Sequence, residues 1–327
     1  MKGFLYRALL FLGVVALVRF FHRRGLTILL YHGVAPKDEA GGIYNYRGKF
    51  ISPESFEHQL RYLAPRYTIL ELDDAVTRLQ GGTLPKNALA ITFDDGYRNF
   101  YTHAYPILSR MGIPATMFVA TDFVLRKRPL WVDRLEYAIG HGEAPLEEKK
   151  QRDDRLRNEL KALSHEDREK RLAQIEHDAG RALTDFEEDR AVYAPLSVYE
   201  IREMQEAGMS FGAHTRTHPI LSRERPEDAH AEIAGSITEL QALMPLSKVF
   251  AYPNGQPGDW TEDNERATEA GGCIAALTTI QGVNTKSTPL YRLKRMAMDA
   301  TDASAAFASV VSGVRLFLGK IKHRIYA

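Results

Sequence analysis

The sequence predicts an α/β fold built from parallel strand–helix units. Short apolar runs that are typical of buried strands alternate with amphipathic stretches at helical spacing, at the separation expected of βα units. Several of these runs end in polar residues or glycine, as strands do where they pass into loops that carry function. At 327 residues, the chain is long enough for one such domain with an insertion.

The first half of the pattern covers residues 26–120. Ser52 and Pro53 supply an N-cap and a first-turn proline for one helix, and Gly82 and Gly112 close two others. The predicted strands are 26–31, 67–70, 88–93 and 115–120, and the predicted helices begin at 52, cover 72–79 and pass through 105–111.

The alternation stops at Trp131 and returns at Ser197. Between about 130 and 195 the chain is highly charged, with sparse apolar residues at helical spacing such as Leu156 and Leu160. We interpret this segment as a helical insertion with a solvated charged face, which could also form a lid or substrate wall. The alternation then continues with strands at 209–213, 249–251, 273–276 and 292–295 and helices at 226–243, 263–270 and 303–318.

Residues 1–25 form a hydrophobic segment ahead of the domain at 26–327. Residues 3–21 are apolar except for two arginines, but the longest uninterrupted apolar stretch is short for a membrane span. No small-residue cleavage site follows, so we expect the segment to be retained. It could be a marginal span, an interfacial helix in contact with membrane lipid, or a helix packed on the domain. The basic cluster at its domain side (Arg19, Arg23 and Arg24) favours a membrane-associated protein with a cytosol-facing domain, with an extracytoplasmic domain as the alternative.

The composition argues against a nucleic-acid partner. The net charge is +1, and the chain shows neither a basic excess nor an acidic tail. The single cysteine, Cys273, excludes an intrachain disulfide and lies in an apolar stretch, where packing is its expected role.

The most informative motif is Asp94-Asp95-Gly96, which directly follows the apolar run 88–93. Side chains alternate along a strand, so two neighbouring carboxylates can serve one site only where the strand gives way to a loop. Two like charges at this distance repel unless a cation lies between them. Taken alone, the pair is also compatible with a turn or a helix cap.

A second polar motif, His214 to His218, follows the short predicted strand at 209–213. A lone His-x-x-x-His is often incidental, but here it completes a ligand set with the Asp pair. One Asp and two imidazoles make an open site for a single divalent ion, and we expect zinc, with cobalt, nickel or iron as alternatives.

At these motifs the chain resembles the polysaccharide deacetylases of the NodB-homology type, carbohydrate esterase family 4. The resemblance rests on four motifs in matching order. They are Thr92-Phe93-Asp94-Asp95-Gly96, His214-Thr215-Arg216-Thr217-His218, Leu29-Leu30-Tyr31-His32-Gly33-Val34 and Phe250-Ala251-Tyr252-Pro253-Asn254-Gly255. The last two resemble the branch that acts on exopolysaccharide and poly-N-acetylglucosamine.

The resemblance implies a distorted (β/α) barrel with its site at the carboxyl ends of the strands. It also implies that Asp95, His214 and His218 hold the metal ion and that Asp94 is the general base for the attacking water. A backbone N–H around Tyr252 to Asn254 would then share the developing oxyanion.

Two departures from the common family pattern concern the acid and the arginine. The late Leu-x-His motif is replaced by Leu293-Lys294-Arg295. We therefore expect His32, at the end of an early strand, to protonate the leaving amine. The alternative is that His32 only packs at that strand end. The arginine that orients the base is missing from its usual motif, and Arg295 could supply it from a neighbouring strand end.

Trp131 and Asp133 resemble the segment that places an aromatic wall and a carboxylate near the sugar. A tryptophan beside polar groups suits stacking on a pyranose, although packing would explain it nearly as well.

The leading hypothesis is a metal-dependent hydrolase that removes N-acetyl groups from an amino-sugar-containing polysaccharide or lipid-linked glycan. An alternative enzyme is a deformylase, or another amide hydrolase, on a lipid-linked amino sugar. An alternative of another class is a non-catalytic carbohydrate-binding protein, although such a protein has no need of a second, free Asp.

Overall fold

The computed structural model describes residues 13–39, 45, 47–140, 143–298, 304–316 and 318. Its centre is an eight-stranded sheet in the order β10-β1-β5-β6-β7-β8-β9, with β4 paired to β5 as a branch. Every strand pair in this sheet is parallel. The strands are β1 (Leu26–Tyr31), β4 (Thr68–Ile69), β5 (Ala88–Phe93), β6 (Thr116–Val119), β7 (Ser210–Ala213), β8 (Val249–Ala251), β9 (Ala275–Leu277) and β10 (Met296–Ala297).

The sheet curves toward closure, and the predicted distorted (β/α) barrel is confirmed. A parallel bridge between Leu277 and Leu293 links the end of β9 to the segment that leads into β10, which in turn pairs with β1. The predicted strand at 292–295 is wrong in detail, because the chain makes only this bridge there, between a 3-10 turn at Leu290–Arg292 and β10.

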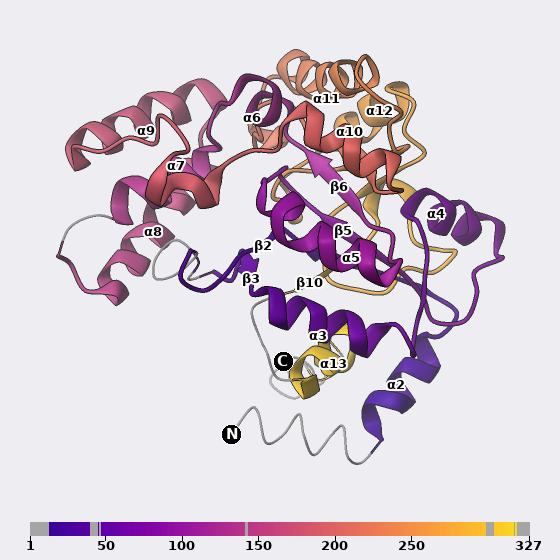
Figure 1. Cartoon of the computed structure of the whole chain (residues 1–327). Coiled ribbons are helices and arrows are strands. Elements are labelled where there is room, and N and C mark those ends of the chain that lie inside the picture. The colour runs from indigo at the N-terminus through magenta and orange to yellow at the C-terminus, as the bar shows by residue number, and fades with distance from the viewer. Residues whose placement is uncertain are drawn as a thin grey trace.

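Helices cover the outside of this sheet (Figure 1). They are α3 (Pro53–Leu63), α4 (Leu72–Gly81), α5 (Tyr105–Met111), α6 (Thr121–Arg126), α10 (Val198–Glu206), α11 (Pro226–Gln241), α12 (Glu262–Ala270) and α13 (Ser304–Val311). The N-cap predicted at Ser52 is confirmed, since its side chain accepts from the amide of Ser55. Helix α10 also begins with a cap, a capping box between Ser197 and Glu200. A π-helix at Phe100–Ala104, which the sequence pattern did not predict, precedes α5.

The parallel register brings the carboxyl ends of the strands to one edge. Tyr31 of β1 lies opposite Phe93 of β5, and Val119 of β6 lies opposite Ala213 of β7. Strands β1 and β5 are buried along their whole length, so both are held firmly in this register. The polar residues that follow β1, β5, β7 and β8 are therefore neighbours in space.

The charged insertion forms three helices beside the barrel, α7 (Trp131–Gly140), α8 (Leu146–Lys161) and α9 (His165–Ala179), seen at the upper left of Figure 1. They share an apolar cluster of their own that includes Trp131, Leu135, Leu156, Leu160 and Leu172. The insertion returns to the barrel through a bridge between Pro195 and Tyr97. Its helices are thus packed on one another and joined to the barrel at the Asp94-Asp95 loop.

Near the N-terminus, helix α2 (Val14–His22) packs on the domain through one face. Val15 is buried in a cluster with Ala308 and Val314, whereas Phe20 and Phe21 are exposed. Much of the predicted segment 3–21 lies outside the described residues. Among the residues that are described, no helix combines the length and the apolar character that crossing a bilayer requires.

Candidate metal and catalytic site

The Asp94-Asp95 pair lies at the end of β5, in a loop that only glycine can complete. The Asp94 amide donates to the Tyr31 carbonyl at 3.0 Å, which extends the β1–β5 pairing by one residue. Asp95 and Gly96 then turn into positive φ, at 79° and 100°. A Cβ on Gly96 would lie 2.8 Å from a methyl carbon of Val124, so a larger residue would be both strained and crowded. The turn points both carboxylates into the mouth of the barrel.

The two histidines come from the loop after β7. The His214 amide donates to Val119, and its ring Nδ1 lies 2.7 Å from the carbonyl of Ala251. That hydrogen bond fixes the tautomer with Nδ1 protonated and leaves Nε2 as the ligand atom. The loop then reverses so tightly that both Thr215 and His218 have positive φ.

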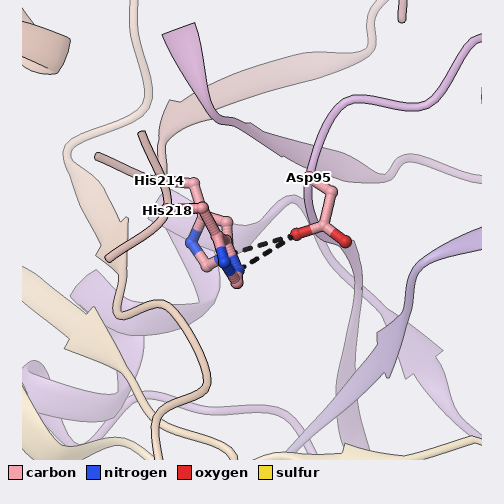
Figure 2. A group of neighbouring side chains, drawn as sticks. All are labelled: Asp95, His214 and His218. Atoms are coloured by element: carbon pink, nitrogen blue, oxygen red, sulfur yellow. Dashed lines mark ion pairs between the residues drawn. The ribbon is translucent and has the colours of Figure 1, made fainter. Parts of the chain in front are cut away.

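Asp95, His214 and His218 converge, with both imidazoles turned toward the carboxylate (Figure 2). The Nε2 atoms of His214 and His218 lie 3.5 and 3.4 Å from the same carboxylate oxygen of Asp95, and the three ligand atoms lie within 4.8 Å of one another. All three side chains are buried, and that Asp95 oxygen has no hydrogen-bond partner. A carboxylate and two imidazoles so arranged fit a divalent ion that keeps an open coordination position.

The electrostatics of Asp95 and His218 agree with this fit. Burial raises the pKa of Asp95, but the two imidazoles outweigh it, and the net pKa lies well below the ordinary value. Burial lowers the pKa of His218 to about 3, so this ring is neutral at physiological pH, as a metal ligand must be. Burial also lowers the pKa of His214, but Asp94 and Asp95 reverse the effect and leave it raised.

Asp94 is held chiefly by Arg295, and the Nε2 atom of His214 lies farther away, 4.0 Å from one of its carboxylate oxygens. The guanidinium donates to both carboxylate oxygens at 2.7 Å, and the same side chain donates to the carbonyl of Thr278. Arg295 is fully buried. Burial raises the pKa of Asp94, but Arg295 and His214 more than offset it, so the net pKa is lowered and the carboxylate is ionised. The arginine missing from its usual motif is therefore supplied at this position.

His32 follows the last residue of β1 and is half-buried. The residue before it, Tyr31, accepts from the Asp94 amide at 3.0 Å, so His32 follows the same end of the paired strands β1 and β5 as Asp94 and Asp95. It is the imidazole there that lies outside the Asp95–His214–His218 cluster.

The loop after β8 differs from expectation at Tyr252. The Tyr252 amide donates to the carbonyl of Leu277 at 3.1 Å, as part of the strand pairing. The Tyr252 ring is buried and stacks on that of Trp260, with 5.3 Å between the ring centroids. Its N–H is therefore not available to an oxyanion. Asn254 has φ 58°, and its amide N–H bonds to nothing within the described chain, so of these two residues it is the one whose N–H could still donate.

Trp131 and Asp133 are both buried, whereas contact with a sugar would require exposed side chains. Trp131 is 3% exposed, and its indole N–H donates to the carbonyl of His218 at 3.1 Å. Asp133 is fully buried, where it accepts from Lys49 and from the hydroxyl of Tyr97. Both side chains are occupied by contacts within the protein, so the prediction of an open stacking platform and a free carboxylate is wrong for this structure.

One residue that shapes the site has no signal in the sequence pattern. Glu232, on α11, accepts from the backbone amides of Arg216 and Thr217 at 2.8 and 2.9 Å and from the hydroxyl of Thr217. It thereby holds the loop between the two histidines. Among the charged residues of an exposed helix, nothing in its local sequence sets it apart.

Comparison with known sequences gives the family. The sequence model described as polysaccharide deacetylase matches residues 81–271, more than half of the chain. A relative named "Putative polysaccharide deacetylase YxkH", from Bacillus subtilis (strain 168), is 21% identical over 293 residues, which cover 89% of this chain and 77% of the relative. The poly-β-1,6-N-acetyl-D-glucosamine N-deacetylase of Staphylococcus epidermidis is 27% identical over 112 residues, 32% of this chain and 39% of that enzyme.

Solved structures agree on the fold. The deacetylase PplD of Streptococcus pyogenes superposes with a TM-score of 0.58 at 21% identity, covering 85% of this chain and 93% of that one. IcaB from Ammonifex degensii also gives 0.58 at 21% identity, covering 87% and 97%. The barrel, the order of the motifs and the family match agree, and the chain belongs to the polysaccharide deacetylase family.

Proposed function

We propose that this protein hydrolyses the N-acetyl groups of an amino-sugar polymer with one divalent ion held by Asp95, His214 and His218. The observation that carries the proposal is the contrast between the two adjacent carboxylates. Asp95 faces two imidazoles with an unpartnered oxygen, whereas Asp94 is locked by an arginine. One carboxylate is thus set up for an ion and the other for a proton. A binding module needs only a surface for its sugar and has no use for this division.

When bound, the ion, for which zinc best suits this donor set, would lower the pKa of a water molecule and polarise the acetyl carbonyl. Asp94 would accept the proton of the attacking water. Its two bonds to Arg295 fix the carboxylate plane and keep it ionised, so that it is ready to accept. The free amide N–H of Asn254 donates to the oxygen on which negative charge develops.

The second half of the reaction needs an acid, because an amine is too basic to depart unprotonated. His32 is the group that we assign to this step. It is half-buried and, unlike His214 and His218, lies outside the metal cluster, so it can carry a proton to the leaving nitrogen.

The proposed substrate class rests on the name of a relative. A relative in Staphylococcus epidermidis is named for poly-β-1,6-N-acetyl-D-glucosamine, and this chain matches 39% of that enzyme. We infer that a polymer of N-acetylglucosamine, free or lipid-linked, is the substrate.

The test is acetate release from N-acetylglucosamine oligomers of several linkages, with N-formyl analogues in parallel and with a chelator as a second condition. The proposal expects chelator-sensitive acetate release that His218→Ala abolishes. His230→Ala is the matched control, since His230 is exposed on α11 and its ring pairs with Asp263, far from the metal ligands in sequence. Preference for the N-formyl analogues would make the protein a deformylase, and binding of the oligomers without turnover would make it a lectin-like module.

We also propose that α2 contacts a membrane surface, with the domain on the cytosolic side. Leu17, Phe20 and Phe21 are among the few large apolar side chains that the described chain exposes, and Arg19, Arg23 and Arg24 lie beside them. Sedimentation with anionic vesicles should fall for Phe20→Glu with Phe21→Glu and be unchanged for Tyr199→Glu, an exposed aromatic elsewhere. Equal sedimentation of all three proteins would exclude this helix as the contact.

A further inference from the structure

The two metal-binding histidines are held in different ways. The ring of His214 is oriented directly, since its Nδ1 bonds the carbonyl of Ala251. The Nδ1 of His218 is buried and has no hydrogen-bond partner among the residues that the structure describes. A ligating imidazole is ordinarily oriented through its second nitrogen, so the direction of the His218 ring depends on how firmly its backbone is fixed.

That backbone is strained and tied at both of its polar groups. His218 has φ 57°, a conformation that a non-glycine residue adopts only when its surroundings impose it. Its amide donates to the hydroxyl oxygen of Thr215 at 3.2 Å, and its carbonyl accepts from the indole N–H of Trp131 at 3.1 Å. The hydrogen bond to Thr215 lies within the loop, whereas the hydrogen bond from Trp131 comes from the insertion.

Trp131 is itself fixed by the insertion. It is the first residue of α7 and packs in the apolar cluster of α7, α8 and α9. The guanidinium carbons of Arg168 and Arg157 lie 5.3 and 6.0 Å from its ring centroid, within cation–π range. Arg168 is fully buried, and its Nε and Nη1 atoms have no hydrogen-bond partner, so the ring of Trp131 is a principal neighbour of this charge.

The same helix also reaches the loop that carries the third ligand. Asp133 accepts from the hydroxyl of Tyr97, two residues beyond Asp95, at 2.8 and 2.9 Å. The return segment of the insertion pairs there too, because Leu196 donates to Gly96 and Arg98 donates to Ala194. Helix α7 therefore touches both loops of the metal cluster.

We propose that the helical insertion stabilises the metal site and that Trp131 is the positioning residue that keeps His218 in the orientation needed to bind the ion. The proposal rests on the proposed metal function of Asp95, His214 and His218. It assigns to Trp131 a role other than sugar stacking, and to the insertion a role in metal affinity that does not require it to move as a lid.

The first test compares metal affinity between two matched variants. Trp131→Phe removes the N–H donor but keeps an aromatic ring in the cluster. Trp260→Phe makes the same change at the only other tryptophan, whose N–H bonds Glu265. Zinc dissociation constants are measured by competition with a chromogenic chelator. Loss of an outer-shell partner typically weakens metal binding by about 10- to 100-fold, so Trp131→Phe should fall in that range and Trp260→Phe should equal the wild type.

The outcomes separate this inference from the proposed function. Failure of the wild type to bind a divalent ion would overturn the function and the inference together. Wild-type affinity in Trp131→Phe would overturn the inference alone. A raised KM of Trp131→Phe with unchanged zinc affinity would assign Trp131 a role in sugar binding and would also overturn the inference.

A second measurement uses the native chain, in case Trp131→Phe does not fold. Coupling between two sites is reciprocal, so if Trp131 supports the ion, the ion must also stabilise the Trp131 hydrogen bond. The hydrogen-exchange rates of the two indole protons are measured without and with zinc, with Trp260→Phe used to assign them. Zinc should slow exchange of the Trp131 proton severalfold and leave that of Trp260 unchanged. Equal rates for Trp131 in both states would contradict the proposal.

Discussion

Arg295 donates one hydrogen bond to each carboxylate oxygen of Asp94, both at 2.7 Å, across 201 residues of sequence. The sheet order brings the two residues near each other, because β10 pairs with β1 and β1 pairs with β5. Arg295 precedes β10, and its long side chain reaches Asp94 at the carboxyl end of β5. Asp95, the next residue, has no such partner and turns instead to His214 and His218. Two neighbouring carboxylates in such different surroundings are what a division into base and metal ligand requires.

Asp94→Asn should abolish most turnover while leaving the metal bound, because the amide cannot accept the water proton. The loss should be about 10²- to 10⁴-fold in kcat, the usual contribution of a general base. Metal content is measured beside activity, and Asp95→Asn provides the contrast, since it should lose the metal. Loss of metal in Asp94→Asn would show that the roles of the two residues are reversed.

Arg295→Met should move the acidic limb of the pH–rate profile to higher pH. Arg295 lowers the pKa of Asp94 against the effect of burial, so its removal raises that pKa, and the base becomes ionised only at higher pH. Breaking a buried ion pair by removing one partner also costs about 3–5 kcal/mol of stability.

The contribution of the Asp94–Arg295 ion pair to the free energy of unfolding depends on pH. The pKa of Asp94 is lowered on folding, so the pair stabilises the wild type above the ordinary pKa of 3.8 and this contribution disappears as the pH falls below it. Thermal unfolding should therefore separate wild type and Arg295→Met most widely near neutral pH. An unshifted acidic limb in Arg295→Met would mean that another group titrates there.

His32→Ala should lose most of its turnover on an amide substrate. The reason is that the leaving amine needs a proton, which this variant cannot supply. An activated ester, whose leaving group needs none, should be hydrolysed at close to the wild-type rate, and His230→Ala should resemble the wild type on both. Equal damage to amide and ester would instead indicate that His32 has a structural role.

The sequence allowed the prediction of those features that depend on local pattern. Buried runs such as 88–93 and caps such as Ser52 predicted the strands and helices closely. The Asp94 and His214 motifs lie together because parallel strands end at one edge. What the sequence could not show was which side chains are already occupied. Trp131 donates to His218, 87 residues away, and Asp133 accepts from Lys49, 84 residues away. No local feature of the sequence indicates such contacts.

Cys273 should not react with thiol reagents in the native protein. Burial raises the pKa of its thiol to about 12, so the reactive thiolate is scarce and enclosed at pH 8. Because the pKa is raised on folding from 9.0, its effect on stability is absent below pH 9 and becomes destabilising as the pH rises from 9 toward 12. Labelling by a chromogenic disulfide should follow global unfolding in denaturant, and rapid labelling without denaturant would contradict the burial of this residue.

The most direct test of the account is a metal titration of chelator-stripped wild-type protein, with bound ion and acetate release from N-acetylglucosamine oligomers measured in the same samples. The account predicts that activity rises from near zero and saturates at one ion per chain, and that His214→Ala and His218→Ala neither bind the ion at those concentrations nor regain activity. Full acetate release by the stripped wild type, or metal binding and activity that survive both histidine substitutions, would contradict the central claim that Asp95, His214 and His218 hold the ion on which catalysis depends.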